Sequence, residues 1–444
     1  MKIIKDSEFD AYWKDLAGRG DDGAGSAVVT AAVQNIIAAV RAEGDTAVRR
    51  FASQFDKSSP EKLEVPRSIA AAAWEKLKAG EGELAAALEL AADHIRRFSL
   101  EQKKQFADFE YQMESGLITG QRVIPVEKAA IYVPAGRFPL ISTVLMGVIL
   151  ALSAGVGEVI LASPPGDDGL PDPRILAAAH LAGAGRIFAI GGAQAIAALA
   201  IGTETIPRVD IIAGPGNKYV AAAKRLLFGE VGIDFVAGPT DVLIITGSAP
   251  QADPAPQADL VLQADLVSAD MLAQAEHDPD ARARVLVPGR EQADRITAAL
   301  ERRLQTLPTA AIARASLDAG GLIIIYDSKD EAVRIANTIA PEHLELQVSD
   351  TENWIPLLRN YGSLFIGEKS AEVLGDYSAG INHTLPTSGS ARFSGGLGVR
   401  HFLKTVTTLR CAEGEGWEQA RRAAEIIARA EGLAGHAESA RSRN

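Results

Sequence analysis

RIFAIGGAQAIAALA, residues 186–200, is the stretch that decides the fold class of this chain. In it, a short β-rich run ends in two glycines, and an alanine-rich helical run begins directly after them. Three more β-rich runs are each followed by a helical run, namely AAIYV (129–133), EVILA (158–162) and VDIIA (209–213). Strands that alternate with helices in this way predict a parallel sheet with helices on both faces.

The turns after these strands are rich in glycine and proline, and they read VPAG, ASPPG, IGGAQ and AGPGN. In parallel α/β sheets, ligands bind beyond the carboxyl ends of the strands, where these turns are expected to lie. GGAQ (191–194) and GPGN (214–217) open helices whose backbone amides could receive a phosphate. Neither is the standard dinucleotide-binding fingerprint. GRGDDG (18–23) matches that fingerprint formally but follows no strand, so we interpret it as a chance match.

A second α/β series is expected from about Gly232. Its predicted strands are GIDFV (232–236), VLIIT (242–246), RVLVP (284–288), LIIIY (322–326), LELQ (344–347) and SLFIG (363–367). Residues 1–25 are polar and loosely patterned, and helices follow to about residue 105. The Pro/Ala-rich segment 247–257 predicts an exposed connection, and residues 417–439 predict one final helix.

Composition narrows the function classes. The chain has 444 residues, which predicts at least two lobes, and its net charge of −12 argues against a nucleic-acid or anionic-membrane surface. The single cysteine, Cys411, excludes internal disulfides and an all-cysteine metal site, and it fits a cytoplasmic setting. The start of the chain lacks the apolar core of a signal peptide. The apolar run from Val144 is broken by serine, glycine and glutamate, which favours a buried helix followed by a strand.

Two short motifs carry side chains suited to metal binding or proton transfer. In AQAEH (273–277), Gln274 and His277 are three residues apart and would share a helix face that could hold zinc. An ordinary polar helix face is the alternative. In APEHLEL (340–346), Glu342 and His343 occupy a predicted helix-to-strand turn and form a ready general acid/base pair. The alternative there is a capped turn with solvated charges.

Two further segments hold candidate ligands. The Gly-rich, strandless run GDYSAGINHTLPTSGSARFSGGLG (375–398) contains Asp376, a possible oxygen ligand, and His383. EGLAGH places Glu431 and His436 at the end of the last predicted helix. A histidine there is usually only solvated, unless the tail docks on a partner subunit.

Taken together, these motifs resemble those of histidinol dehydrogenase, the zinc enzyme family that completes histidine biosynthesis. The similarity runs from about residue 27 to His436. The motifs that carry it stand in the expected order: YVPAG, STVLM, GGAQAIAALAIGTETIP, GPGNKYV, AGPTD, AQAEH, APEHLEL, GDYSAGINHTLPT, ARFSGGL and EGLAGH.

The resemblance implies a fold of two incomplete Rossmann-like parallel-sheet domains with a helical N-terminal region and a C-terminal helical tail that swaps between the subunits of a homodimer. The expected partition is a helical region (1–110) that packs partly with the second α/β domain, an NAD-binding domain (111–236), a second domain with zinc ligands (237–380), and the swapped tail (381–444).

The resemblance also assigns roles to individual residues. It implies one zinc ion per subunit, with the ligands Gln274, His277, Asp376 and, from the other subunit, His436. Glu431 would receive the substrate's amino group. Glu342 and His343 would be catalytic, Glu342 by activating water and His343 by removing protons. The expected NAD contacts are Tyr132, Gln194 and Asn217. Thr240, His343, His383, Glu431 and the zinc ligands would line the pocket of a small alcohol substrate.

The family oxidises an amino alcohol through an aldehyde to an acid with two NAD molecules in turn. Many aldehyde-oxidising enzymes use a cysteine nucleophile. Cys411 lies outside every motif, which favours a route through water activated by Glu342.

Several residues depart from the usual family pattern. Arg137 follows PAG, Thr240 lies in AGPTD, and Arg400 and His401 follow FSGGLGV. These features resemble a sister group that oxidises sulfopropanediol to sulfolactate, since a guanidinium suits a sulfonate. Glu431 favours histidinol instead, because a carboxylate suits an amino alcohol and repels a sulfonate. Histidinol is therefore the expected substrate, another small polar alcohol is the alternative, and a non-catalytic binding module is the third hypothesis.

Overall fold

The computed structural model describes residues 1–17, 25–135, 139–247 and 257–443. Three sequence predictions fall wholly or mostly between these ranges: the chance match GRGDDG, the cation Arg137 and the connection 247–257. They lie outside the described residues.

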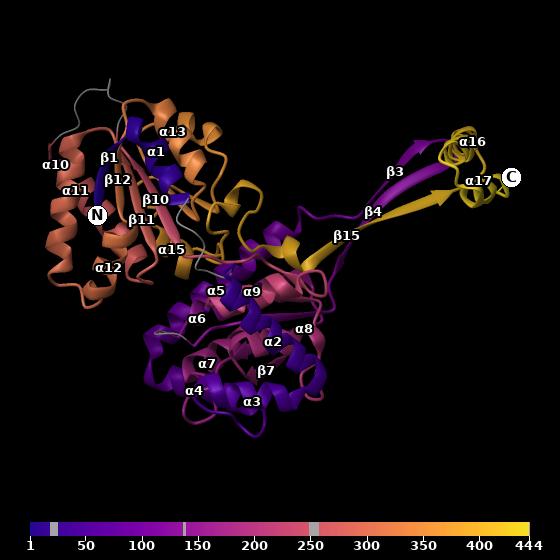
Figure 1. Cartoon of the computed structure of the whole chain (residues 1–444), viewed down its shortest axis with the longest axis horizontal. Coiled ribbons are helices and arrows are strands. Elements are labelled where there is room, and N and C mark those ends of the chain that lie inside the picture. The colour runs from indigo at the N-terminus through magenta and orange to yellow at the C-terminus, as the bar shows by residue number, and fades with distance from the viewer. Residues whose placement is uncertain (18–24, 136–138, 248–256, 444) are drawn as a thin grey trace.

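Two α/β lobes and a projecting arm make up the molecule (Figure 1). The sheet strands of the first lobe are β2 (Glu64–Val65), β5 (Lys128–Tyr132), β6 (Glu158–Ser163), β7 (Arg186–Ala189), β8 (Ile211–Ala213) and β9 (Gly232–Ile233). Those of the second lobe are β1 (Lys2–Lys5), β10 (Asp241–Thr246), β11 (Arg282–Val287), β12 (Leu322–Ile325), β13 (His343–Gln347) and β14 (Ser363–Ile366).

The strand orders are β2-β7-β6-β5-β8-β9 and β1-β12-β11-β10-β13-β14. Every neighbouring pair in the two sheets is parallel except β2 with β7. The predicted α/β class with two parallel-sheet domains is therefore confirmed.

Helices cover both faces of each sheet. The first lobe contains α2 (Ala27–Glu43), α3 (Asp45–Phe55), α4 (Arg67–Gly80), α5 (Gly82–Lys103), α6 (Ile141–Ala154), α7 (Pro173–Ala182), α8 (Gly192–Ile201) and α9 (Lys218–Leu227). The second contains α1 (Asp6–Ala17), α10 (Gln257–Ala275), α11 (Arg290–Leu304), α12 (Ala310–Gly320), α13 (Lys329–Ile339), the short α14 (Thr351–Trp354) and α15 (Glu372–Tyr377).

Strand β5 shows why both faces must be covered. Ala129 and Ile131 enter the apolar cluster formed with α4 to α7, whereas Ala130 and Tyr132 enter the cluster formed with α2, α8 and α9. Side chains of a strand alternate between its faces, so a strand buried on both faces is apolar throughout. The apolar run from Val144 is likewise interior, since it forms most of α6 and then β6. Among the described helices, none has the length and apolarity needed to span a bilayer.

Two predictions about strand membership were wrong. GIDFV was assigned to the second series, but its first two residues form β9, which pairs with β8 in the first sheet. The buried Asp234 ends this strand, because its carboxylate accepts the Gly214 amide and pairs with Lys224. The polar start of the chain was expected to be loosely patterned. Instead, β1 adds a parallel edge strand to the second sheet beside β12.

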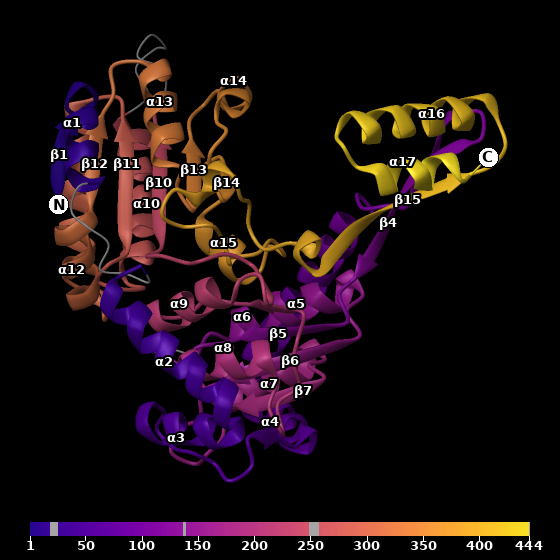
Figure 2. The same ribbon diagram turned by 45° about the vertical axis from the view of Figure 1, so that its right-hand side comes forward.

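The strands of the arm were not predicted. Strands β3 (Phe109–Glu114), β4 (Leu117–Pro125) and β15 (Leu403–Cys411) form an antiparallel sheet of order β15-β4-β3. Helices α16 (Glu415–Ala430) and α17 (Ala434–Arg441) pack together at its end (Figure 2). The single helix expected over 417–439 is therefore wrong. Gly432 divides it, because its φ of 78° lies in the left-handed region that ends helices.

Candidate active site

The Glu-His turn lies at the start of β13 in the second lobe. Ala340 adopts a left-handed conformation (φ 51°) that ends α13, and Pro341 follows. His343 opens β13, one residue earlier than predicted. Glu342 and His343 are only 5% and 3% exposed. The alternative of solvated charges is therefore wrong.

Glu342 is held by donors from the first residue of β10 and the residue before it. The Thr240 hydroxyl donates to Glu342 Oε2, and the Asp241 amide donates to the same oxygen at 3.0 Å. In return, the Glu342 amide donates to the Asp241 carboxylate at 3.1 Å, and that carboxylate pairs with the buried Arg284. Burial raises the pKa of Glu342 to about 7, although the charge of His343 and the Thr240 bond work against the rise. A carboxylate with this pKa can take up a proton near neutral pH.

The His343 ring lies among three carboxylates. Its Nδ1 is 3.3 Å from the Asp241 carbonyl oxygen and 3.9 Å from one oxygen each of Glu342 and Glu372. Its Nε2 is 3.6 Å from Asp376 Oδ1. Burial alone would lower the pKa of His343, but the surrounding carboxylates outweigh it and raise this pKa well above its ordinary value. With Nδ1–H directed at a carbonyl, Nε2 is the nitrogen that gains or loses the titrating proton.

The AQAEH motif differs in detail from its prediction. Helix α10 ends before His277, whose amide donates to the Gln274 carbonyl at 3.4 Å. Gln274 is buried, and its Nε2 donates to the Thr240 hydroxyl at 2.8 Å, which leaves its amide oxygen for another partner. Glu276 turns elsewhere and accepts the hydroxyl of Thr309. Gln274 is thus linked through Thr240 to Glu342.

Asp376 meets these residues from α15, which packs against α10. Its Oδ1 is buried and has no hydrogen-bond partner among the described residues. Burial would raise the pKa of Asp376, but His343, His383 and His277 together lower it. The ionised carboxylate therefore faces three imidazoles.

The donor set suits zinc but is incomplete in one chain. Gln274, His277 and Asp376 offer an amide oxygen, an imidazole and a carboxylate, all of which zinc accepts. Within the described part of one chain, no group of three or more His, Cys, Asp or Glu side chains could hold a metal. Glu431 and His436 are exposed on the arm, which projects away from the lobes (Figures 1 and 2). These two predicted residues do not join the others in a single chain.

His383 lies near the same cluster. Its Nε2 is 3.0 Å from the Ser142 hydroxyl and 3.4 Å from that of Thr143, at the start of α6. Burial lowers the pKa of His383, although the charge of Asp376 raises it. These contacts hold His383, and with it the Gly-rich run, against the first lobe. The lowered pKa favours the neutral imidazole.

The sequence missed a row of buried polar side chains behind His343. In β13, His343, Glu345 and Gln347 share one face, while the intervening leucines enter the apolar core on the other. Glu345 accepts the Glu372 amide at 2.9 Å, and Gln347 donates to both Glu345 and Asp270. Burial raises the pKa of Glu345 to about 8 and that of Glu372 well above its ordinary value. Polar and apolar residues alternate in HLELQ, and this alternation was the signal that could have revealed the polar row.

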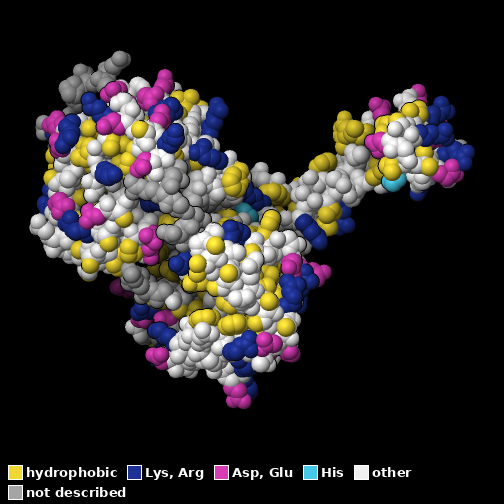
Figure 3. Space-filling view, in the orientation of Figure 1, with side chains coloured by type: hydrophobic (Ala, Val, Ile, Leu, Met, Phe, Trp, Pro, Cys, Tyr) yellow, Lys and Arg dark blue, Asp and Glu magenta, His cyan; other side chains and the backbone are white. Residues whose placement is uncertain are grey.

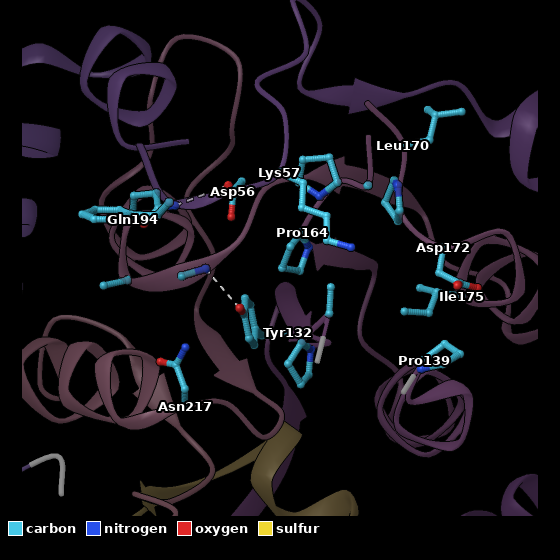
Figure 4. A pocket seen from close by; sticks show the side chains of 18 of the residues that line it. Asp56, Lys57, Tyr132, Pro139, Pro164, Leu170, Asp172, Ile175, Gln194 and Asn217 are labelled. Carbon is cyan, nitrogen blue, oxygen red and sulfur yellow. Dashed lines mark hydrogen bonds between the residues drawn. The ribbon is translucent and has the colours of Figure 1, made fainter. Parts of the chain in front are cut away.

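A cavity of about 1040 Å³ lies at the carboxyl ends of the first-lobe strands. The three predicted cofactor contacts, Tyr132, Gln194 and Asn217, all line it (Figure 4). The Tyr132 hydroxyl accepts the Gly192 amide at 3.0 Å, and burial raises the pKa of Tyr132 to about 12. Asn217 caps α9 by accepting two backbone amides. The structure therefore brings these residues together where α/β sheets bind ligands.

The departures from the family pattern have mostly local roles. His401 Nδ1 is 3.1 Å from the Gly398 amide within its own short 3-10 turn (Val399–Phe402), and Arg400 is exposed. Thr240, in contrast, is central, because it bridges Gln274 and Glu342.

Comparisons with known proteins identify the family of this chain. The sequence matches the histidinol dehydrogenase family over residues 22–444. It is 48% identical over 407 residues to histidinol dehydrogenase of Thermus thermophilus, covering 92% of each chain. It is 44% identical over 414 residues to that of Pseudomonas aeruginosa, covering 93% of this chain and 90% of the relative. The crystal structure of histidinol dehydrogenase from Elizabethkingia anophelis superposes with a TM-score of 0.88 at 34% identity, covering 100% of this chain and 97% of that one. This chain belongs to the histidinol dehydrogenase family.

Proposed function

We propose that this enzyme is a cytoplasmic, zinc- and NAD-dependent histidinol dehydrogenase that oxidises L-histidinol to L-histidine through the aldehyde. The buried Glu342–His343 pair carries the proposal, since it stands beside Gln274 and Asp376 at the end of a parallel sheet. Family membership supports the histidinol reading over the sulfonate alternative, because the relatives compared above are named for histidinol.

His343 is the base in both oxidations. In the first, its Nε2 takes the proton of the substrate hydroxyl while the carbon transfers a hydride to NAD, which gives the aldehyde, NADH and a proton. The Asp241 carbonyl fixes the ring by accepting from Nδ1. The Glu342, Glu372 and Asp376 carboxylates stabilise the imidazolium that forms.

Glu342 prepares the second oxidation. As a carboxylate it takes a proton from water, whose oxygen adds to the aldehyde carbon and gives a gem-diol. Loss of a second hydride to NAD, with proton transfer to His343, yields the acid. Because burial raises the pKa of Glu342 to about 7, the basic form is available at neutral pH and above.

Gln274, His277 and Asp376, with His436 of a second copy, would hold zinc. When bound, zinc acts as a Lewis acid and orients the substrate through its nitrogen and oxygen donors. The buried Asp376 Oδ1 supports this assignment, since it has no hydrogen-bond partner among the described residues and lies 3.6 Å from His343 Nε2.

The arm supports a swapped homodimer. Neighbouring strands of its sheet place Tyr111, Thr119 and Leu409 side by side on one face. Phe109 joins them, and Phe109, Tyr111 and Leu409 are 55%, 60% and 67% exposed. Hydrophobic side chains are visible along the arm in Figure 3. A thin sheet with uncovered aromatic residues is typical of a surface buried by a partner, here a second copy.

The stoichiometry of NADH tests the proposed reaction. Limiting L-histidinol with excess NAD should give two NADH per substrate, measured by absorbance, and histidine should be the product. Sulfopropanediol should give no NADH under the same conditions. Turnover of the sulfonate without turnover of histidinol would contradict the proposal.

Cys411→Ser should leave kcat and zinc content unchanged, because the thiol is exposed on β15 of the arm and the water route does not use it. Steady-state kinetics and metal analysis of the purified variant check this. Loss of turnover with zinc retained would show that the thiol, rather than water, attacks the aldehyde.

A further inference from the structure

The residues directly after β6 carry no carboxylate, although dinucleotide-binding sheets usually have one there; Asp168, further along this loop, lines the cavity, but its Oδ1 accepts the Leu170 amide. The parallel strands of the first sheet follow the order β7-β6-β5-β8, which is the third, second, first and fourth in chain order. In this arrangement an acidic residue near the end of the second strand accepts the adenosine ribose hydroxyls. Here β6 ends at Ser163, and Pro164 and Pro165 follow it in the chain. None of these three residues has a carboxylate that could accept the ribose hydroxyls.

Asp56 supplies a carboxylate at this place from a different element. It caps the carboxyl end of α3 and lines the 1040 Å³ cavity together with Pro164 and Gln194 (Figure 4). The Asp56 carboxylate and Pro164 lie close to the backbone of Gly191. A Cβ added to Gly191 would lie 2.5 Å from Pro164 Cγ and 2.6 Å from Asp56 Oδ1, so only glycine fits there. Asp56 is therefore built against the ends of β6 and β7.

The Asp56 carboxylate is oriented by donors from α8 and the turn before it. Its Oδ2 lies 3.4 Å from both the Gly191 amide and Gln194 Nε2. Among the described residues, both donors to this carboxylate bind Oδ2, which leaves Oδ1 for a ligand in the cavity. Burial raises the pKa of Asp56 to about 6, so the group is mostly ionised at neutral pH.

This arrangement changes the role of the GGAQ turn. The sequence suggested that the amides at the start of α8 could receive a phosphate, as those of α9 could. The Asp56 carboxylate already accepts the Gly191 amide, so an anion at α8 would meet a like charge. A cofactor phosphate is therefore better accommodated near Asn217, where α9 begins.

We infer that Asp56 selects the cofactor: its free oxygen accepts the adenosine ribose hydroxyls of NAD and its charge excludes the 2′-phosphate of NADP. The inference rests on the proposal that this cavity is the NAD site. Lys57 lines the same cavity and would attract a 2′-phosphate, but it is exposed and therefore strongly screened by solvent. Asp56 is more buried and held by two donors, so its charge dominates at the ribose.

Asp56→Asn tests the inference, because it keeps the shape and the acceptor but removes the charge. For histidinol oxidation, kcat/KM with NAD should fall about 10-fold, mainly through KM, and kcat/KM with NADP should rise about 10-fold, as expected for one charged hydrogen bond. Asp172→Asn is the matched control. Asp172 lines another part of the cavity and caps α7, so its replacement should change the NAD:NADP ratio less than about threefold. Thermal unfolding should show both variants folded.

Direct binding separates this inference from the proposed reaction. NADH and NADPH are titrated by fluorescence against the zinc-loaded wild type, Asp56→Asn and Asp56→Ser. Preference for NADH that is lost in both variants supports the inference even if histidinol is not oxidised. If histidinol is oxidised with NAD but the NAD:NADP ratio stays unchanged in the Asp56 variants, or changes in Asp172→Asn instead, the inference is wrong and the proposed reaction stands. Failure of the wild type to bind either cofactor would overturn both.

Discussion

His343→Asn is expected to lower kcat for histidinol oxidation about 10³-fold, the middle of the range for loss of a general base. Asparagine can still donate to the Asp241 carbonyl, which Nδ1 faces at 3.3 Å, but it has no counterpart of the basic Nε2. The fold and zinc content should therefore persist while proton removal fails. Steady-state and single-turnover measurements of NADH formation check this, and both hydride transfers should slow together.

His180→Asn is the matched control for that experiment. His180 is an exposed histidine on α7, outside the cluster around β13, so its replacement should leave kcat within about twofold of wild type. If His343→Asn kept wild-type activity, another group would have to be the base. If it lost zinc as well as activity, His343 would also be needed for metal binding, which contradicts its expected role as a base alone.

Mixing two inactive variants should restore activity if the tail is exchanged between subunits. His436→Asn alone should lose zinc and fall at least about 10³-fold in kcat, because a zinc ligand is missing. His343→Asn is inactive because the base is missing from the second lobe of the same chain. In a mixed dimer, one site contains both substitutions and the other contains neither. Random reassociation makes half of the dimers mixed, so about a quarter of wild-type activity should return.

The readout is activity after the two variants are unfolded or dissociated together and reassembled, compared with each variant treated alone. Cys411→Ser mixed with His343→Asn serves as a positive control for reassembly, since the first variant remains active. Absence of complementation despite mixed dimers on native mass spectrometry would mean that His436 completes the site of its own chain. A monomeric wild type would contradict the swap outright.

The sequence by itself determined the α/β class and which residue types could do chemistry. The apolar β-rich runs are buried on both faces, so their composition alone predicts strands of a parallel sheet, and β5, β6, β7 and β8 lie where expected. The APEHLEL and AQAEH motifs also identified Glu342, His343 and Gln274 from local pattern. Their burial was not predictable, because it depends on α10 and α15, which come from distant segments.

Other features were decided by contacts that no local pattern contains. Strand β1 is polar at both ends and is recognisable only from its pairing with β12. In β3 the apolar residues Phe109, Tyr111 and Met113 alternate with polar ones, but this apolar face is exposed within one chain, so the pattern did not show what would cover it. Asp56 belongs to none of the motifs that the sequence analysis singled out.

Only the tertiary structure places Asp56 beside the ends of β6 and β7, and only it gathers carboxylates around His343. The physical reason is the same in each case. Periodicity reports which face of an element is buried, whereas the neighbours that fix a charge, a pKa or a ligand contact come from elsewhere in the chain.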